Sequence, residues 1–125
     1  MNSSQVECVF SSDNDKFAQQ TYEANFHEVP TGDIKAVNEK DIPSFDILTA
    51  GFPCQPFSYA GEKQGFNDEV RGTLFFDVCR ILEYHKPPMV FLENVKGLKS
   101  HDNGKTLQTV LDTLKKLGYY PHWTI

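Results

Sequence analysis

The sequence predicts an α/β fold in which a mostly parallel sheet carries helices on both faces. Short apolar runs of strand length alternate along the chain with longer segments that place apolar residues at helical spacing. Each apolar run is bounded by glycine, proline or small polar residues, which end regular structure. This alternation is typical of parallel sheets, because a crossover between parallel strands needs a helix-sized connection.

Length and composition describe one soluble globular domain. The chain has 125 residues, of which 39% are hydrophobic and 23% charged, and its formal net charge is −5. No apolar run is long enough to span a bilayer, and the amino-terminal residues do not resemble a signal peptide. The negative charge gives no electrostatic footprint for DNA by itself.

The three cysteines indicate a reducing, cytoplasmic setting. Cys8, Cys54 and Cys79 show neither paired nor metal-ligand spacing, so no metal site is expected. Cys8 and Cys79 lie in apolar periodic segments and are interpreted as buried core residues.

The first half of the chain is expected to hold a strand, a helix and a loop before a second strand. Residues 6–10 are a short strand-like run, and the polar cluster after it can cap a helix over residues 16–24. Residues 28–40 are polar, which indicates a loop with at most one very short strand at residues 32–34. Residues 45–50 are apolar and predict a buried strand.

The alternation continues after a long connection. Residues 58–72 are irregular and rich in glycine and charge, and loops of this length are commonly functional. Residues 71–85 place apolar side chains at helical spacing and are followed by Pro87-Pro88, which predicts a helix that ends there. Residues 89–92 predict a second buried strand.

The chain is predicted to close with a third helix and a strand. Asn103-Gly104 opens the helix, and Gly118 stands where a C-terminal cap belongs. Residues 119–125 then predict a final strand.

Cys54 is the first candidate for a chemical role. It lies in Gly51-Phe52-Pro53-Cys54-Gln55-Pro56-Phe57-Ser58, directly after a predicted strand, and its flanking prolines favour a stiff irregular loop. Ligands of open α/β sheets bind at the carboxyl ends of strands, where a thiol is better placed for reactivity than for packing. The alternative is that Cys54 is a small buried hydrophobic residue.

Glu93 is the second candidate, because it follows the apolar run of residues 89–92. Successive parallel strands present their carboxyl ends on one edge, so Cys54 and Glu93 are expected beside one crevice. A nucleophile with a carboxyl group nearby is a workable catalytic pair. Two alternatives stay open: Glu93 as a solvent-facing carboxylate, and a cysteine hydrolase, although no histidine carries a specific signal for one.

Three segments resemble motifs of the cytosine-C5 DNA methyltransferases, the bacterial restriction–modification type included. The segments are Pro53-Cys54-Gln55-Pro56-Phe57-Ser58 for motif IV, Arg71-Gly72-Thr73-Leu74-Phe75 for motif V and Glu93-Asn94-Val95-Lys96-Gly97-Leu98 for motif VI. Their order and separations match, and residues 13–26, 32–34 and 100–119 also look like family segments. Motifs in register are far more specific than one short match.

The resemblance implies a fold and a reaction. It implies a doubly wound, Rossmann-like sheet and transfer of a methyl group from S-adenosylmethionine to a cytosine flipped out of double-stranded DNA. Cys54 matches the nucleophile that adds to C6 of the base, and Glu93 matches the residue that holds its N3 edge. Asn94 matches a residue that braces the Pro-Cys loop, whereas Gln55 and Ser58 match positions that face DNA.

For the cofactor, the resemblance implies residues from several segments. Asp13 matches the acidic residue that binds the ribose hydroxyl groups, and Asn14 stands where an adenine-stacking side chain is common. The family usually has Glu and an apolar or aromatic residue at these two positions, so both are departures. The remaining matching positions around the adenine and its pocket are Asp33, Ile34, Pro53 and Leu74.

Other family segments have no counterpart in the sequence. These are the Gly-rich motif I, the target-recognition region and a final cofactor motif, so residues 1–125 resemble a partial catalytic domain that lacks the first strand of the sheet. We therefore expect activity only with a complementing chain or segment, and self-association and weak cofactor binding without one. The alternatives are a non-catalytic assembly module and a thiol enzyme of another class.

Overall fold

The computed structural model describes residues 6–54 and 73–125. The chain divides into two compact units, Met1–Phe45 and Asp46–Ile125. Residues 55–72 lie outside the described residues, so the predicted irregular connection and the DNA-facing candidates Gln55 and Ser58 are not placed. No helix in the described part of the chain is both long and apolar enough to cross a membrane.

The first unit contains one α-helix, α1 (Lys16–Phe26), which confirms the helix predicted over residues 16–24. Asp15 caps it by accepting a hydrogen bond from the main-chain N–H of Ala18 at 2.8 Å, as expected of the polar cluster before the helix. His27 ends it in the left-handed conformation, with φ of 58°.

The strand predicted at residues 6–10 is wrong, because this segment pairs with no strand among the described residues. Instead, one isolated parallel bridge joins Ser12 to Thr31. The two segments then diverge, since one enters α1 and the other enters a short 3₁₀-helix. A strand needs a partner along its length, and an apolar run alone does not supply one.

The very short strand expected at residues 32–34 is also wrong. Asp33 caps a 3₁₀-helix there, η1 (Ile34–Ala36), by accepting a hydrogen bond from the N–H of Lys35 at 2.9 Å. This local bond turns the backbone away from an extended path. A second 3₁₀-helix, η2 (Glu39–Asp41), follows it.

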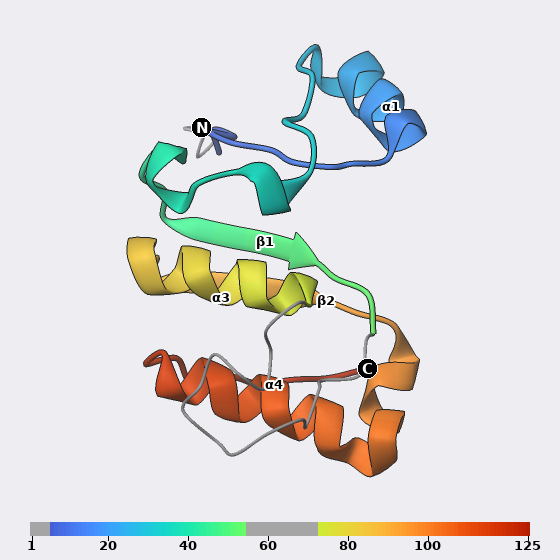
Figure 1. Ribbon diagram of the computed structural model, residues 1–125, viewed down its shortest axis with the longest axis vertical. Coiled ribbons are helices and arrows are strands. Elements are labelled where there is room, and N and C mark those ends of the chain that lie inside the picture. The colour runs from blue at the N-terminus through green and yellow to red at the C-terminus, as the bar shows by residue number, and fades with distance from the viewer. Residues whose placement is uncertain (1–5, 55–72) are drawn as a thin grey trace, which may run out of the picture. The chain divides into compact units, whose positions relative to one another are not determined.

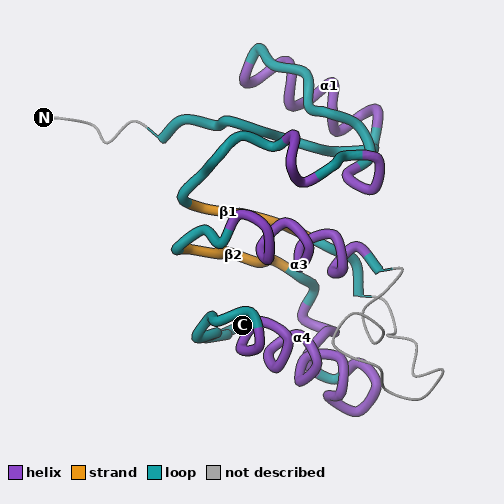
Figure 2. Tube along the Cα trace, turned by 60° about the vertical axis from the view of Figure 1, so that its left-hand side comes forward, coloured by secondary structure: helices purple, strands orange, loops and turns teal. Residues whose placement is uncertain are grey.

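The second unit is a strand–helix–strand arrangement, so the α/β prediction holds in the form of a small parallel sheet. Strands β1 (Ile47–Gly51) and β2 (Met89–Glu93) lie side by side and parallel, with Ile47 opposite Met89 and Gly51 opposite Glu93 (Figure 2). Helix α3 (Leu74–His85) lies between them in sequence, and Thr73 caps it. Both predicted strands and the predicted helix are confirmed, with small shifts in their bounds. The strands are not buried as predicted, because exposed and half-buried residues alternate along each of them.

Helices α3 and α4 (Lys105–Lys116) share one hydrophobic core on one face of the sheet (Figure 1). The buried helix side chains are Phe75, Val78, Cys79, Leu82, Val110 and Leu114, packed against strand residues Leu48, Ala50, Val90 and Leu92. Because side chains alternate along a strand, the other face carries Ile47, Met89 and Phe91, which are 48%, 57% and 67% exposed. The expected helices on both faces are therefore found on one face among the described residues of this unit.

Two further 3₁₀-helices lead from β2 to α4: η3 (Lys96–Lys99) and η4 (His101–Gly104). Asp102, Asn103 and Gly104 all have left-handed backbones, with φ of 49°, 54° and 82°. Asn103-Gly104 thus precedes the helix as predicted.

The end of α4 confirms Gly118 as a cap and explains a wrong prediction. Gly118 has φ of 95°, its N–H bonds the carbonyl of Lys115, and the N–H of Tyr119 bonds the carbonyl of Leu114, both at 3.0 Å. This is the Schellman arrangement. The strand predicted at residues 119–125 does not form, because Tyr119 uses its N–H for the cap and no described strand lies beside the segment.

Candidate active site at the strand ends

The carboxyl ends of β1 and β2 lie next to each other, and each is followed by a candidate residue. Gly51 pairs with Glu93 in the parallel register. From Gly51 the chain continues through Phe52 and Pro53 to Cys54, so both candidates come from the same edge of the sheet. This is the edge at which open α/β sheets bind ligands.

Asn94 links the two strand ends. Its side-chain nitrogen donates a hydrogen bond to the main-chain carbonyl of Phe52, and its side-chain oxygen accepts one from the N–H of Val95 at 2.9 Å. The first residue after β2 therefore holds the first residue after β1. Because the Phe52 carbonyl is held, the direction in which the chain leaves toward Cys54 is restricted.

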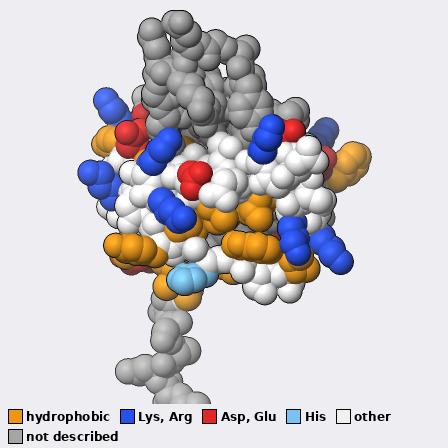
Figure 3. All heavy atoms as spheres, turned by 90° about the horizontal axis from the view of Figure 1, so that it is seen from below, with side chains coloured by type: hydrophobic (Ala, Val, Ile, Leu, Met, Phe, Trp, Pro, Cys, Tyr) orange, Lys and Arg blue, Asp and Glu red, His pale blue; other side chains and the backbone are white. Residues whose placement is uncertain are grey.

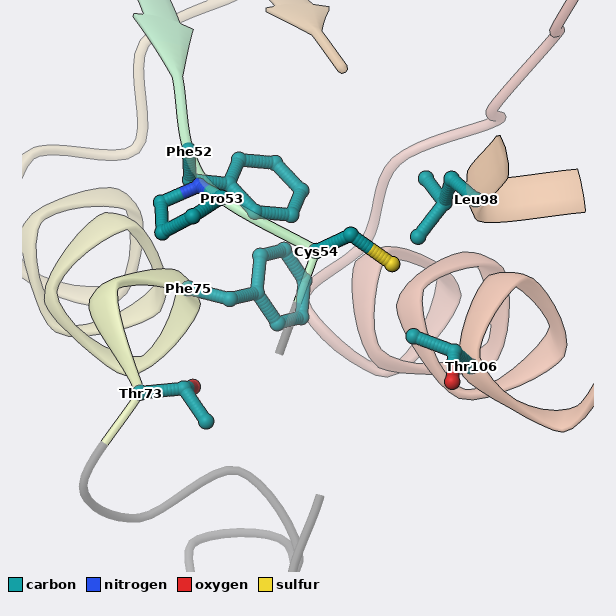
Figure 4. Close-up of a pocket in the computed structure, with 7 residues that line it drawn as sticks. All are labelled: Phe52, Pro53, Cys54, Thr73, Phe75, Leu98 and Thr106. Atoms are coloured by element: carbon teal, nitrogen blue, oxygen red, sulfur yellow. The ribbon is translucent and has the colours of Figure 1, made fainter. Parts of the chain in front are cut away.

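Cys54 lies in a small pocket, and its sulfur points toward Leu98 and Thr106 (Figure 4). The pocket is lined by Phe52, Pro53, Cys54, Thr73, Phe75, Leu98 and Thr106. The rings of Phe52 and Phe75 pack with their centroids 5.2 Å apart, which supports the loop from the α3 side. Among the described residues no histidine lines this pocket, so the thiol–imidazole pair of a cysteine hydrolase gains no support here.

The three cysteines differ in accessibility. Cys54 is half-buried, Cys79 is buried as predicted, and Cys8 is exposed, which contradicts the prediction of a buried residue. Cys8 is exposed because residues 6–10 form no strand that would turn it into a core. Burial, with a smaller effect of Glu83, raises the pKa of the Cys79 thiol to about 12.

The Glu93 carboxylate lies over the end of β1. Its Oε2 atom is 3.1 Å from the position that a Cβ atom would occupy at Gly51. Glu93 alternates with the core-facing Val90 and Leu92, so it lies on the face of the sheet away from α3 and α4. Among the described residues no hydrogen bond joins Glu93 to Cys54; the structure brings them to one edge but not into hydrogen-bond contact.

Four of the cofactor candidates lie in the first unit, on two segments that hydrogen bonds join. The N–H of Asp13 donates to the carbonyl of Thr31 at 3.0 Å, and the Ser12 hydroxyl donates to the carbonyl of Gly32 at 2.6 Å. Asp13 and Asn14 are exposed on one segment, and Asp33 and Ile34 follow on the other. The bridge between Ser12 and Thr31 thus brings Asp13 and Asn14 close to Asp33 and Ile34.

The other two cofactor candidates lie in the second unit. Pro53 lines the Cys54 pocket, and Leu74 is the half-buried first residue of α3, between Thr73 and Phe75, which also line that pocket. Both therefore lie near Cys54.

Thr106 is a pocket residue that no sequence pattern indicates. It is 2% exposed, and its hydroxyl lies 2.6 Å from Nδ1 of His101 across the left-handed turn. In the sequence it is one polar residue at the polar start of a helix. Only the packing of α4 against the loop after β1 reveals its position below Cys54.

Basic side chains do not form a single patch on the face shown in Figure 3. The Lys and Arg side chains stand among acidic and hydrophobic ones around that face. This distribution agrees with the net charge of −5 and gives no electrostatic footprint for DNA on the surface shown.

The three sequence motifs and the strand-end placement of Cys54 agree with a comparison across protein families. The family of C-5 cytosine-specific DNA methylases matches residues 1–125. The chain therefore belongs to the C-5 cytosine-specific DNA methylase family.

Three relatives from the curated proteins are Type II methyltransferases. M.DsaV of Dactylococcopsis salina is 58% identical over 118 residues, which are 94% of this chain and 33% of the relative. M.HhaI of Haemophilus parahaemolyticus is 57% identical over 117 residues, or 94% of this chain and 36% of the relative. M.HpaII of Haemophilus parainfluenzae is 59% identical over 116 residues, or 90% and 32%. The chain spans about a third of the length of these relatives.

Proposed function

We propose that the protein containing these residues methylates C5 of cytosine in double-stranded DNA, with S-adenosylmethionine as the methyl donor. Residues 1–125 would form the cofactor- and cytosine-binding part of its catalytic domain, and β1 and β2 would belong to a larger doubly wound, Rossmann-like sheet. Since the chain spans about a third of its relatives, activity is proposed together with the further segments that those relatives carry. As the family resemblance implies, we expect a target-recognition region and a Gly-rich cofactor motif among those segments.

The observation that carries the proposal is the placement of Cys54. A half-buried thiol lies at the carboxyl end of β1, in a pocket, on a loop that Asn94 ties to the end of β2. Thiolates are strong nucleophiles when they are accessible and held in a defined direction. A structural cysteine has no need of either property, as buried Cys79 illustrates.

Cys54 makes C5 of the base reactive. Its thiolate adds to C6 and forms an S–C6 bond, and the electron pair of the C5–C6 double bond moves toward C5, which becomes enamine-like. S-adenosylmethionine, when bound, supplies an electrophilic methyl group for this carbon. Release of the C5 proton to a base and cleavage of the S–C6 bond then restore the double bond and free Cys54. The ring edge is reachable only after the base leaves the stack.

Glu93 stabilises the base during addition. As Cys54 adds to C6, negative charge develops on the ring, and a proton held at N3 by the Glu93 carboxyl group offsets it. The carboxylate comes from the strand beside that of Cys54, and we propose that both side chains contact one flipped base. Gln55 and Ser58, which lie outside the described residues, are proposed to face DNA.

The cofactor candidates have suitable chemistry for S-adenosylmethionine. One carboxylate oxygen of Asp13 accepts a hydrogen bond from the N–H of Asp15 at 2.8 Å, and one carboxylate oxygen of Asp33 accepts a hydrogen bond from the N–H of Lys35 at 2.9 Å. A carboxylate accepts several hydrogen bonds, so both carboxylates can also accept hydrogen bonds from ribose hydroxyl groups. Asn14 and the half-buried Ile34 are proposed to contact the adenine, and Pro53 and Leu74 are proposed to line the adenine pocket.

The test is covalent trapping on duplexes of mixed sequence in which 5-fluorocytosine replaces cytosine. Fluorine cannot leave C5 as a cation, so the S–C6 bond persists after methyl transfer. We expect a denaturation-resistant protein–DNA adduct that requires S-adenosylmethionine and maps to Cys54 by mass spectrometry. Cys54→Ser should abolish the adduct, whereas Cys8→Ser, at an exposed cysteine outside the site, should retain it. An adduct that forms equally well with Cys54→Ser would refute the proposal.

A further inference from the structure

We propose that Gly51 is a positioning residue for Glu93: the absence of a side chain at Gly51 lets the Glu93 carboxylate lie across the end of β1. The inference rests on the proposed function, in which that carboxylate holds the N3 edge of cytosine. It adds a residue that touches neither the base nor the cofactor but determines where a catalytic group can lie.

The backbone does not require glycine at this position. In the described part of the chain, the glycines with positive φ are Gly104 and Gly118. Gly51 is instead an ordinary paired residue of β1, opposite Glu93. Glycine weakens a strand and often marks a close approach of another group, which at Gly51 is the Glu93 carboxylate.

Among the described residues the close approach involves Glu93. A Cβ atom at Gly51 would lie 3.1 Å from Oε2 of Glu93 and would meet no other heavy atom of residues 6–54 and 73–125 within 4 Å beyond its chain neighbours. This separation is tighter than an ordinary van der Waals contact, so the carboxylate would have to move by a few tenths of an ångström. A methyl group here would therefore displace one chemical group and leave the surrounding packing intact.

Nothing else in the described part of the chain holds the carboxylate. Glu93 is exposed, and no hydrogen bond or ion pair joins it to a described residue. Its position over β1 is thus limited by the bare backbone of Gly51 rather than by a polar partner. Catalytic groups lose rate steeply when they are misplaced, about 10²-fold for 1 Å. A shift of a few tenths of an ångström should therefore cost about 4- to 10-fold.

The experiment measures the single-turnover rate of Cys54 adduct formation on 5-fluorocytosine DNA, with the protein that contains these residues. The variants are Gly51→Ala, Glu93→Ala and the double variant. Gly97→Ala is the matched control, since a Cβ there would meet Val95 at an ordinary 3.9 Å. Gly51→Ala should slow adduct formation about 4- to 10-fold and leave cofactor affinity within about 2-fold. Gly97→Ala should not change the rate.

The double variant decides whether Gly51 acts through Glu93. In the Glu93→Ala background no carboxylate remains to be displaced, so adding Gly51→Ala should change the rate by less than about 2-fold. If Gly51→Ala lowers the melting temperature, Glu93→Ala should restore it by removing the close contact. A wild-type rate for Gly51→Ala overturns the inference, and so does equal slowing in both backgrounds or an unrestored melting temperature. In each of these cases the wild-type adduct still supports the proposed function; absence of that adduct overturns both.

Discussion

The side-chain amide of Asn94 donates a hydrogen bond to the main-chain carbonyl of Phe52, so the residue after β2 is tied to the residue after β1. Backbone pairing between the strands ends at Gly51 and Glu93. The Asn94 bond extends the connection one residue beyond the sheet, where the loop to Cys54 begins. The loop that carries the thiol is thereby anchored two residues before Cys54 by a polar contact that an apolar side chain could not make.

Replacement of Asn94 by Ala should loosen the Cys54 loop. The part-buried Phe52 carbonyl would lose its donor, which costs about 1–3 kcal/mol of unfolding free energy. Turnover should fall about 10-fold or more, because the nucleophile is no longer held in direction. Urea unfolding and steady-state kinetics measure the two effects. Asn25→Ala is the matched control, since Asn25 also donates to a main-chain carbonyl, that of Thr21, but within α1. Unchanged turnover in Asn94→Ala would contradict the bracing role.

Replacement of Glu93 by Gln should reduce turnover by about 10²-fold or more, because the amide keeps the shape but cannot share a proton with N3. Cofactor affinity should stay near that of the wild type. Steady-state kinetics and calorimetric titration with S-adenosylmethionine separate the two quantities. Glu83→Gln, at an exposed glutamate of α3, serves as the control. Normal turnover in Glu93→Gln would return Glu93 to the role of a solvent-facing carboxylate.

The buried thiol of Cys79 should lower the free energy of unfolding at alkaline pH. Burial raises the pKa of its thiol to about 12 in the folded chain, whereas in the unfolded chain the thiol ionises near its ordinary pKa of about 8.5. Between these values the folded state keeps a proton that the unfolded state releases. The free energy of unfolding therefore falls as pH rises, by at most ~1.4 kcal/mol per pH unit, and the contribution is complete below about pH 8.5.

Urea unfolding at several pH values between 7 and about 11 tests this dependence. Cys79→Ala should be less stable at neutral pH because it leaves a cavity, but its stability should fall less steeply above about pH 9. If the free energy of unfolding falls equally steeply with pH in the wild type and in Cys79→Ala, the Cys79 thiol is not the cause of the pH dependence.

The exposed face of the sheet predicts self-association of the 125-residue chain by itself. Ile47, Met89 and Phe91 are 48%, 57% and 67% exposed and lie side by side on adjacent strands. Contiguous apolar surface of this kind favours association. Light scattering should show a mass that rises with concentration, and Phe91→Ser should reduce the rise. Tyr120→Ser, at a residue 92% exposed outside the sheet, is the control. A monodisperse monomer at all concentrations would contradict the prediction.

Much of the fold could be predicted because its signals are local. The helices have periodic apolar faces and recognisable caps, such as Asp15 before α1 and Gly118 after α4. The strands at residues 6–10 and 119–125 were predicted from composition and are wrong, since a strand exists only where a neighbour pairs with it. The residues described here supply that neighbour for β1 and β2 alone.

The sequence by itself determined the family, the candidates Cys54 and Glu93, and their place after two strands, because motifs and strand ends depend on residues adjacent in the chain. Only the tertiary structure decided what surrounds them. The bond from Asn94 to Phe52, the position of Thr106 below Cys54 and the approach of Glu93 to Gly51 join residues far apart in sequence. Such contacts follow from strand register and helix packing, which no local pattern encodes.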